Sequence, residues 1–397
     1  MKLYINLARA VIQALELIFT EGKYADKVIE KVLKQNPKWG ARDRRFIAET
    51  TYDIVRWYRL IENITEAEDK DYWKLLGGWC ILNEIELPTW EEFKGLSPQK
   101  VQNRFTKMNG VRRFRESIPD WLDTLGEQEL GKHWDRELKA LNEEAAVVLR
   151  VNTLKASVRE VQERLGQQEV ETTYVKEFPD ALMLNERQNV FRLPEFKDGL
   201  FEVQDAASQL IAPFLKPEPG MRVIDACAGA GGKALHLSAL MQGRGRILAM
   251  DVEGWKLDEL KKRARRAEAS NIETRVIESS KTIKRLEGSA DRLLLDVPCS
   301  GLGVLKRNPD AKWKLAPEFI EEVKVLQQHI LNDYWQMLKP GGLMVYSTCS
   351  VLPSENQNQV KQFLSAHGGK FDLMEEHHAW PSEGYDGFYM ALIKRVS

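Results

Sequence analysis

Two cysteines in the C-terminal half of the chain are the residues best suited to chemistry. Cys299 lies in residues 293–303, LLLDVPCSGLG, and Cys349 lies in residues 344–356, MVYSTCSVLPSEN. In both segments an apolar run gives way to small, turn-forming residues, so each thiol is expected just beyond a strand. The carboxyl ends of strands in an open α/β sheet face the ligand crevice. Two thiols at that edge indicate covalent catalysis with one nucleophile and one helper.

Paired thiols suit methyl transfer to a pyrimidine ring carbon. C5 of a pyrimidine is a poor nucleophile, but addition of a thiolate to C6 turns C5 into an enamine-like carbon that can attack a methyl sulfonium. The adduct must then lose the C5 proton and release the thiol, which gives a second thiol a use. Asp296 ends the strand before Cys299, and its carboxyl could bind the N3/N4 edge of the ring. For Cys227, a small buried packing residue is the favoured interpretation.

A glycine-rich turn forms the second candidate site. Residues 224–233, IDACAGAGGK, take a predicted strand through three glycines and into a helix near Lys233, so a ligand could approach free backbone N–H groups. Asp251 ends the next predicted strand, where a carboxylate can bind ribose hydroxyls. The spacing is not a full GxGxxG, and Ala234 excludes a phosphate-binding P-loop. Nicotinamide dinucleotide and S-adenosylmethionine both fit, but the paired thiols favour S-adenosylmethionine because hydride transfer has no use for them.

Alternating strands and helices are expected from residue 221 onward, which predicts a mostly parallel sheet covered on both faces. The predicted strands span residues 223–227, 247–252, 274–278, 292–297 and 343–347. The fourth and fifth should be adjacent, because the Lys-Pro-Gly-Gly turn at 339–342 leads directly into the fifth. Residues 371–374 and 387–394 are predicted to form a terminal antiparallel hairpin. Ser354 and Gln357 resemble a capping box that starts a helix after the second cysteine.

The preceding part of the chain divides into a helical region and a small α+β module. Helices are predicted at 6–19, 24–34, 43–63 and 72–83. In the module, strands are predicted at 146–152, 170–175, 180–184 and 189–192, with a helix at 158–165; its size is common among RNA-recognition modules.

Residues 100–115 carry six basic residues and no acid, which suits either a solvated face or a phosphate-contacting patch. With residues 145–200, this patch is the predicted RNA-binding surface. The target cytosine must leave its stack, since chemistry at C5 and C6 needs access to one face of the ring.

Composition sets the remaining expectations. The 397 residues carry a formal net charge of −1, so any basic surface must be local. Four cysteines without CxxC spacing argue against a zinc site and a disulfide framework, and fit a reducing compartment. No apolar stretch reaches the ~18 residues of a membrane helix, and the N-terminus has no cleavage pattern. We therefore expect a cytoplasmic monomer without a metal or a membrane partner.

Five segments resemble the Sun-type family of RNA cytosine-C5 methyltransferases, with the bacterial 16S ribosomal RNA enzymes as the closest group. The two cysteine segments, LDVPCSGLGVLKRNPDAKW and YSTCSVLPSENQ, are similar almost residue for residue. DACAGAGGK resembles the cofactor loop of the family, VQDAAS its linker and LRVNTLK its RNA-module motif. Residues 1 to about 130 resemble, more weakly, an antitermination-factor-like helical domain.

This resemblance implies specific roles for the site residues. Cys349 would be the nucleophile, Cys299 would assist product release, and Asp296 would position the base and the cofactor. The implied S-adenosylmethionine ligands are Cys227, Ala228, Gly229, Ala230, Gly231, Gly232, Lys233, Asp251, Glu278 and Asp296. Three residues depart from the usual family pattern: Ala230 replaces a proline, Ala234 a threonine and Glu278 an aspartate.

Together these features predict an enzyme that methylates C5 of a cytosine in RNA, with 16S ribosomal RNA as the substrate and a covalent Cys349–C6 adduct. The expected domains are a helical RNA-binding domain at 1–140, a small α+β module at 141–205 and a Rossmann-like methyltransferase domain at 206–397. A transfer RNA methyltransferase and a catalytically silent RNA-binding assembly factor remain alternatives. A DNA cytosine methyltransferase is disfavoured, because those enzymes use the Pro-Cys thiol and usually carry a large late recognition domain.

Overall fold

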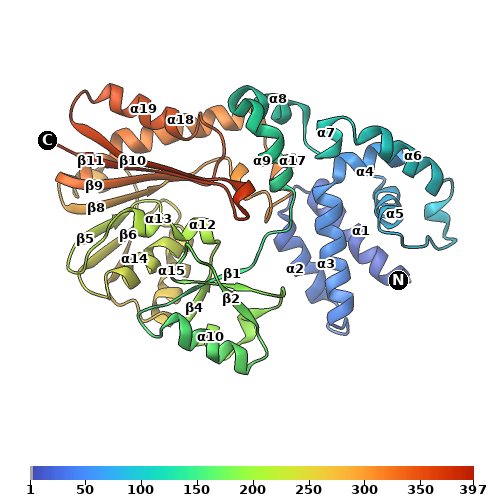
Figure 1. Cartoon of the computed structure of the whole chain (residues 1–397), viewed down its shortest axis with the longest axis horizontal. Helices are drawn as coiled ribbons and strands as arrows, with labels where there is room; N and C mark the ends of the chain where they lie inside the picture. The colour runs from blue at the N-terminus through green and yellow to red at the C-terminus, as the bar shows by residue number, and fades with distance from the viewer. Residues whose placement is uncertain (1–2) are drawn as a thin grey trace. The chain divides into compact units, whose positions relative to one another are not determined.

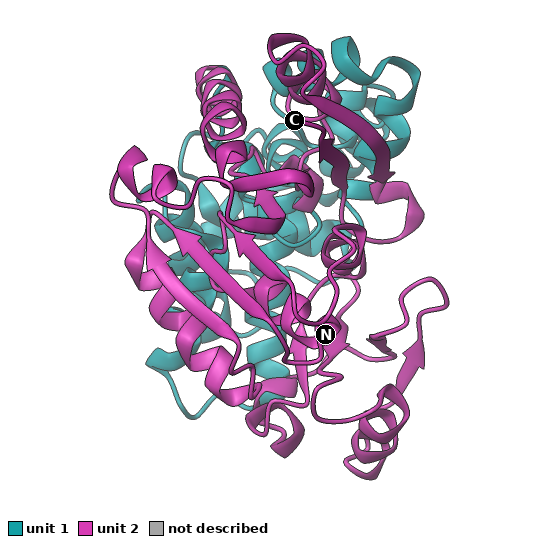
Figure 2. Ribbon diagram, turned by 90° about the vertical axis from the view of Figure 1, so that its left-hand side faces the viewer, with its two compact units in different colours: residues 1–143, 305–317 teal, residues 144–304, 318–397 magenta. Residues whose placement is uncertain are grey.

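The computed structural model describes residues 3–397, which form two compact units. Unit 1 combines Met1–Glu143 with Leu305–Pro317, and unit 2 combines Glu144–Val304 with Glu318–Ser397 (Figure 2). The second half of the first cysteine segment, from Leu305 onward, is therefore part of the helical unit, which the sequence did not indicate. Among residues 3–397, every helix is too short or too polar to span a bilayer.

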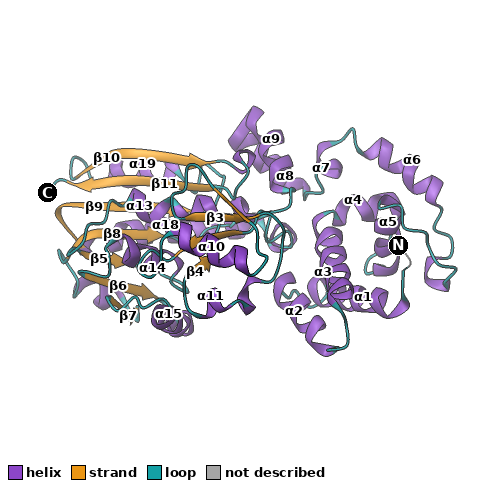
Figure 3. Cartoon of the chain, turned by 60° about the horizontal axis from the view of Figure 1, so that its bottom comes forward, coloured by secondary structure: helices purple, strands orange, loops and turns teal. Residues whose placement is uncertain are grey.

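Unit 1 is built from helices, as the sequence predicted (Figure 3). The predicted helix at 43–63 is in fact two helices, because the backbone leaves the helical region at Trp57 (φ −105°, ψ 21°). The α-helices of this unit are α1 (Ile5–Phe19), α2 (Ala25–Gln35), α3 (Ala41–Arg56), α4 (Tyr58–Thr65), α5 (Tyr72–Leu82), α6 (Pro98–Met108), α7 (Arg112–Arg115), α8 (Asp120–Leu130), α9 (Trp134–Leu141) and α17 (Ala311–Lys314).

Unit 2 begins with a small antiparallel sheet of strand order β2-β3-β1-β4. Its elements are β1 (Val148–Val151), α10 (Val158–Gln167), β2 (Thr172–Tyr174), β3 (Ala181–Leu184), α11 (Pro194–Lys197) and β4 (Phe201–Val203). The strand predicted at 189–192 is wrong: Val190–Arg192 is a 3₁₀ turn, started by the Asn189 side chain, which accepts a hydrogen bond from Phe191 N–H at 3.1 Å. The fourth strand is instead β4, for which the sequence predicted no strand and which ends at Val203, the first residue of the VQDAAS segment.

A seven-stranded sheet forms the rest of unit 2, in the order β10-β11-β9-β8-β5-β6-β7. Strands β5 to β9 are parallel, and β10 and β11 add the predicted antiparallel hairpin at one edge. The strands are β5 (Arg222–Asp225), β6 (Arg246–Asp251), β7 (Ile272–Val276), β8 (Ala290–Asp296), β9 (Leu338–Thr348), β10 (Phe371–Ala379) and β11 (Phe388–Arg395). The predicted Rossmann-like architecture is confirmed, including the adjacency of β8 and β9.

Helices cover both faces of this sheet because consecutive strand residues point to opposite sides. Leu294 belongs to one apolar core, while Leu293 and Leu295 belong to the other. Figure 1 shows α18 and α19 above the sheet and α13, α14 and α15 below it. The helices are α12 (Ala206–Gln209), α13 (Ile211–Phe214), α14 (Gly232–Leu240), α15 (Gly254–Arg266), α16 (Ser280–Lys284), α18 (Pro317–Tyr334) and α19 (Gln357–Ala366).

Two local predictions near the second cysteine need correction. The expected turn at 339–342 lies inside β9: the register passes from Ala290 opposite Leu338 to Arg292 opposite Leu343, so the extra residues bulge out of the strand. Helix α19 begins at Gln357 with Asn356 as its N-cap, and no side chain caps it. Ser354 and Gln357 therefore do not form a capping box.

Candidate active site

The two cysteine turns meet at the carboxyl ends of neighbouring parallel strands. Asp296, the last residue of β8, lies opposite Ser347 of β9, so Cys299 and Cys349 leave the sheet at the same level. Their sulfur atoms are 3.1 Å apart, and the Cys349 N–H donates to Cys299 Sγ at 3.3 Å. Gly303 allows the backbones of the two turns to pack closely, because a side chain at this position would collide with the carbonyl oxygens of Cys349 and Gly387. The structure thus brings both predicted thiols to one point.

The environment of Cys299 keeps its thiol protonated. The hydrogen bond with Cys349 raises the pKa of Cys299 well above its ordinary value, and burial and the charges of Cys349 and Glu355 act in the same direction. A protonated thiol at this position is a hydrogen-bond donor beside the sulfur of Cys349. The geometry therefore suits a division of roles between the two cysteines.

Asp296 is held in place from two sides. Lys233 Nζ lies 2.6 Å from its Oδ2 atom, and the Ser347 hydroxyl donates to its Oδ1 atom at 2.9 Å. Burial lowers the pKa of Lys233, but the Asp296 carboxylate outweighs burial, and the charge of Cys349 adds to it, so the pKa of Lys233 is raised. A positive charge thus lies near the second thiol.

The glycine-rich turn follows β5 and connects it to α14. Gly229 and Gly231 have φ values of 52° and 86°, which other residues rarely adopt, and a side chain on Gly231 would collide with Leu260. Asp251 fixes the turn: its Oδ2 atom accepts from Gly229 N–H at 2.9 Å, and its Oδ1 atom accepts from Glu253 N–H at 2.9 Å. Asp251 thus shapes the turn, and the binding of a ligand by the turn stays a prediction.

A cavity of about 180 Å³ lies between this turn and Asp296. Its lining comprises Val203, Gln204, Ser208, Asp225, Cys227, Ala228, Gly232, Lys233, Arg263 and Asp296. Five of these are predicted site residues, and Cys227 is thus part of the cavity wall. A larger cavity of about 720 Å³ lies in unit 1 among residues 81–102, and none of the predicted site residues lines it.

Asp225 is a cavity residue that the sequence analysis missed, although it heads the DACAGAGGK motif. It is 1% exposed, and neither carboxylate oxygen has a hydrogen-bond partner. Burial raises the pKa of Asp225 to about 7, and the Asp296 charge adds to this effect. A buried, unpartnered carboxyl group facing a polar cavity suits a ligand that carries positive charge.

Other predicted cofactor residues do not line this cavity. Ala230 presents its carbonyl oxygen to Arg263, whose Nη1 atom donates to it at 2.8 Å. Glu278 follows β7 and is exposed. Among residues 3–397, no group of three or more His, Cys, Asp or Glu side chains could hold a metal ion.

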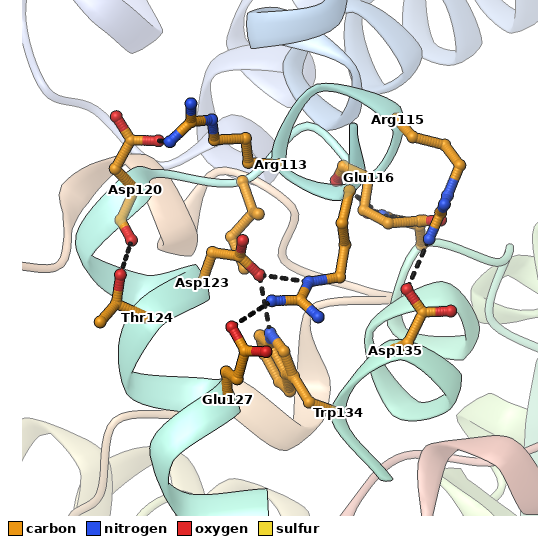
Figure 4. Close-up of polar contacts among 12 residues, drawn as sticks. Arg113, Arg115, Glu116, Asp120, Asp123, Thr124, Glu127, Trp134 and Asp135 are labelled. Carbon is orange, nitrogen blue, oxygen red and sulfur yellow. Dashed lines mark hydrogen bonds and ion pairs between the residues drawn. The ribbon is translucent and has the colours of Figure 1, made fainter. Parts of the chain in front are cut away.

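The arginines of the basic segment 100–115 do not form a free cationic patch. Figure 4 shows that acidic side chains of α8 and α9, with Glu116, pair with the arginines of α7. The closest contact of Arg112 is 2.7 Å, from its Nε atom to Asp123 Oδ1, and this hydrogen bond raises the pKa of Arg112. The pairs are Arg112 with Asp123 and Glu127, Arg113 with Asp120, and Arg115 with Glu116 and Asp135. These acids lie after residue 115 in the sequence, so the composition of residues 100–115 alone could not predict the ion pairs.

Comparison with known proteins shows what this chain is similar to. Residues 212–394 match the family model described as 16S rRNA methyltransferase RsmB/F, and residues 118–191 match a ferredoxin-like domain of the RsmF/B-like methyltransferases. The "Probable ribosomal RNA small subunit methyltransferase B" of Synechocystis is 32% identical over 441 positions, which cover 94% of this chain and 96% of the relative.

Solved structures give the same result. The crystal structure of PH0851 matches with a TM-score of 0.84 at 26% identity and covers the whole of both chains. A methyltransferase homolog protein from Pyrococcus horikoshii matches with a TM-score of 0.63 at 28% identity, over 72% of this chain and 97% of that one. The similarity thus extends well beyond the cysteine turns.

Proposed function

The chain belongs to the RsmB/F family of 16S rRNA methyltransferases, which methylate RNA with S-adenosylmethionine, and from this premise we propose that its target atom is C5 of a cytosine in 16S ribosomal RNA. One observation carries the proposal: the sulfur atoms of Cys299 and Cys349 lie 3.1 Å apart beside Asp296. Methylation at an oxygen or an exocyclic nitrogen has no use for two thiols, whereas methylation at C5 requires a nucleophile at C6 and its later release.

The residues around the cavity fit S-adenosylmethionine. The unpartnered Asp225 carboxyl and Asp296 give the cavity an acidic character, which suits the sulfonium and ammonium charges of this cofactor. The backbone of residues 227–233 would hold its methionine part, and Asp251 would bind the ribose hydroxyls. When bound, the cofactor supplies an electrophilic methyl group. Glu278 stays a proposed cofactor ligand with a longer arm than the usual aspartate.

In the proposed reaction Cys349 attacks the base and Cys299 helps to free it. The Cys349 thiolate forms a bond to C6 and pushes electron density to C5, which takes the methyl group. C5 then gives its proton to solvent, the C5=C6 bond re-forms, and the electron pair of the C6–S bond returns to Cys349. The protonated Cys299 thiol, 3.1 Å away, donates a hydrogen bond to the departing sulfur. Asp296 would bind the amino edge of the base, held in place by Lys233 and Ser347.

Substitution of each cysteine separates their roles. Cys349→Ala should lower turnover on a 16S ribosomal RNA substrate by about 10³-fold or more, because the nucleophile is lost, and should form no covalent RNA complex. Cys299→Ala should accumulate an adduct that survives denaturing electrophoresis, because release is impaired. Cys80, which is buried in unit 1, supplies the control, and Cys80→Ala should keep turnover and leave no adduct.

The product is identified by nucleoside mass spectrometry and by bisulfite sequencing of RNA from cells with and without the protein. A methylated base other than 5-methylcytosine would contradict the proposed target atom. Methylation of transfer RNA instead of ribosomal RNA would keep the chemistry and change the substrate. No methyl transfer to either RNA, with intact RNA binding, would indicate a silent assembly factor. An adduct that depends on Cys299 and not on Cys349 would reverse the roles.

A further inference from the structure

A buried carboxylate binds both cysteine turns at once. Glu355 is 0% exposed and lies between β9 and α19. Its Oε1 atom accepts from the hydroxyls of Ser300 and Ser350 at 2.5 and 2.6 Å. Its Oε2 atom accepts from Ser300 N–H at 2.8 Å and from the Gln327 amide at 3.0 Å. Because Ser300 follows Cys299 and Ser350 follows Cys349, one side chain holds the neighbour of each thiol.

Four donors and no acceptor surround Glu355, which matches an ionised carboxylate. Hydrogen bonds to a charged acceptor are stronger than those between neutral groups. A buried charge of this kind is stable only while its hydrogen bonds are complete, so displacement of either serine is costly. The charge therefore opposes separation of the two turns.

Further hydrogen bonds keep each turn from rotating about this carboxylate. Gln327 of α18 also donates to the carbonyl oxygen of Pro298 at 3.0 Å, which fixes the first turn on its other side. Asn356 donates to the carbonyl oxygen of Ser350 at 2.9 Å and accepts from the Thr348 hydroxyl at 2.5 Å, which fixes the second turn. Gln327 thus fixes the first turn and Asn356 the second, and Glu355 is the residue that binds both turns.

We propose that Glu355 is a positioning residue that holds the turns of Cys299 and Cys349 together and so sets the distance between the two thiols. The inference rests on the proposed function only in taking both thiols as parts of the reaction. Since Glu355 is fully buried, it acts through Ser300 and Ser350 and not by contact with substrate.

Thiol oxidation tests this proposal without RNA or cofactor. Diamide takes one proton and one electron from each thiol and becomes a hydrazine, and the two sulfurs form a disulfide. The rate of Cys299–Cys349 disulfide formation, read by peptide mass spectrometry, reports how well the thiols are aligned. Glu355→Gln offers one acceptor oxygen and two amide hydrogens where four donors need acceptors. We expect the rate to fall by about ten-fold or more, because small displacements of reacting groups are costly.

Two further measurements separate positioning from general damage to the fold. Glu355→Gln should lower kcat and leave KM for S-adenosylmethionine unchanged, since Glu355 contacts neither the glycine-rich turn nor Asp251. Glu322→Gln, an exposed position on α18, is the matched control and should behave like the wild type in every measurement. A folded Glu355→Gln protein with the wild-type oxidation rate would overturn the inference.

Ser350→Ala decides the matter if Glu355→Gln does not fold. It keeps the carboxylate but removes one of its four donors, together with the oxygen that accepts from Leu352 N–H at 3.1 Å and from the Ser300 hydroxyl at 3.3 Å. The oxidation rate should therefore fall by a smaller factor, about three-fold. An unchanged rate would overturn the inference. Because the oxidation needs no RNA, its outcome stands apart from that of the cytosine-C5 proposal, which the methylation assays test.

Discussion

At the scale of single residues, Asp225 shows how the position of a side chain in the fold changes its hydrogen bonding and its pKa. In sequence it is the acid that precedes a glycine-rich turn; in the structure its carboxyl is buried without a hydrogen-bond partner, and its pKa rises to about 7. The same fold gives Asp296 two partners, Lys233 and Ser347. Two aspartates at one cavity thus have different surroundings, because only Asp296 has a counter-charge within hydrogen-bond reach.

The stability of the cofactor-free protein should reflect this pKa. The unfolded chain releases the Asp225 proton near pH 4, while the native state keeps it until about pH 7, so the free energy of unfolding falls as the pH rises through that window. The Asp225→Asn protein has an amide at this position, which does not titrate, and so lacks this pH dependence. Its free energy of unfolding, relative to wild type, should therefore increase by about 2–3 kcal/mol from about pH 5 to about pH 8. Denaturant titrations at both pH values measure the difference; an equal difference at both would show that Asp225 does not titrate in this range.

At the scale of elements, the glycine-rich turn depends on parts of the chain far from it. Arg150 of β1 donates to the carbonyl oxygen of Gly232 at 2.5 Å, and Arg263 of α15 donates to that of Ala230. Glu202 of β4 accepts from Arg263 at 3.0 Å and from Arg266 at 2.5 Å. The small antiparallel sheet therefore helps to hold the turn in place.

Glu202→Gln should show this dependence. Loss of a buried charge leaves two arginines without a charged partner, which should cost about 3 kcal/mol in the free energy of unfolding. The affinity for S-adenosylmethionine should also fall by several-fold, because Arg263 no longer holds Ala230 firmly. Chemical denaturation and calorimetry measure the two effects. Glu273→Gln is the control, since its pair with Arg246 is half exposed and such pairs contribute about 0–1 kcal/mol. Unchanged affinity in Glu202→Gln would mean that the turn is stable without the sheet.

At the scale of the whole molecule, unit 1 is assembled from two separate stretches of the chain. Asp310 accepts from Ala25 N–H at 3.2 Å at the start of α2. Lys312 is 1% exposed, donates to Asn142 at 3.1 Å, and has a lowered pKa, chiefly from burial. Trp313 donates from its Nε1 atom to the carbonyl oxygen of Val55 at 2.7 Å. The segment Leu305–Pro317 thus completes a core that is otherwise built from the first 143 residues.

Trp313→Ala should therefore destabilise unit 1 specifically. Trp313 packs edge-on against Tyr58, with ring centroids 5.5 Å apart, and its loss should cost about 2–4 kcal/mol because it is only partly buried. Hydrogen exchange should show faster amide exchange in α3 and α4, with the strands of unit 2 unaffected. Trp255→Ala is the control, since Trp255 is 68% exposed and exposed substitutions usually change stability by less than about 0.5 kcal/mol. Equal loss of protection in both units would show that they unfold together.

The sequence by itself determined the architecture of the sheet and the place of the candidate site residues at its edge. Each parallel strand is a short apolar run bounded by turn residues, and the thiols, Asp296 and the glycine-rich turn follow such runs, so their place at the carboxyl ends could be predicted. Local boundaries were less certain, as at Trp57 and Val190, because helix breaks and short turns depend on a few side-chain contacts.

Only the tertiary structure decided which distant groups come together. Three features depend on residues that are separated along the chain: the acids that pair with Arg112, the four donors around Glu355 and the burial of Asp225 without a hydrogen-bond partner. The spacing of apolar residues in the sequence does not predict such contacts. The same is true of Leu305–Pro317, whose sequence continues the first cysteine segment but whose core contacts lie in unit 1. The physical reason is that a hydrophobic pattern is formed by neighbouring residues and can be read from the sequence. Burial and electrostatic pairing depend on distant residues and arise only when the chain has folded.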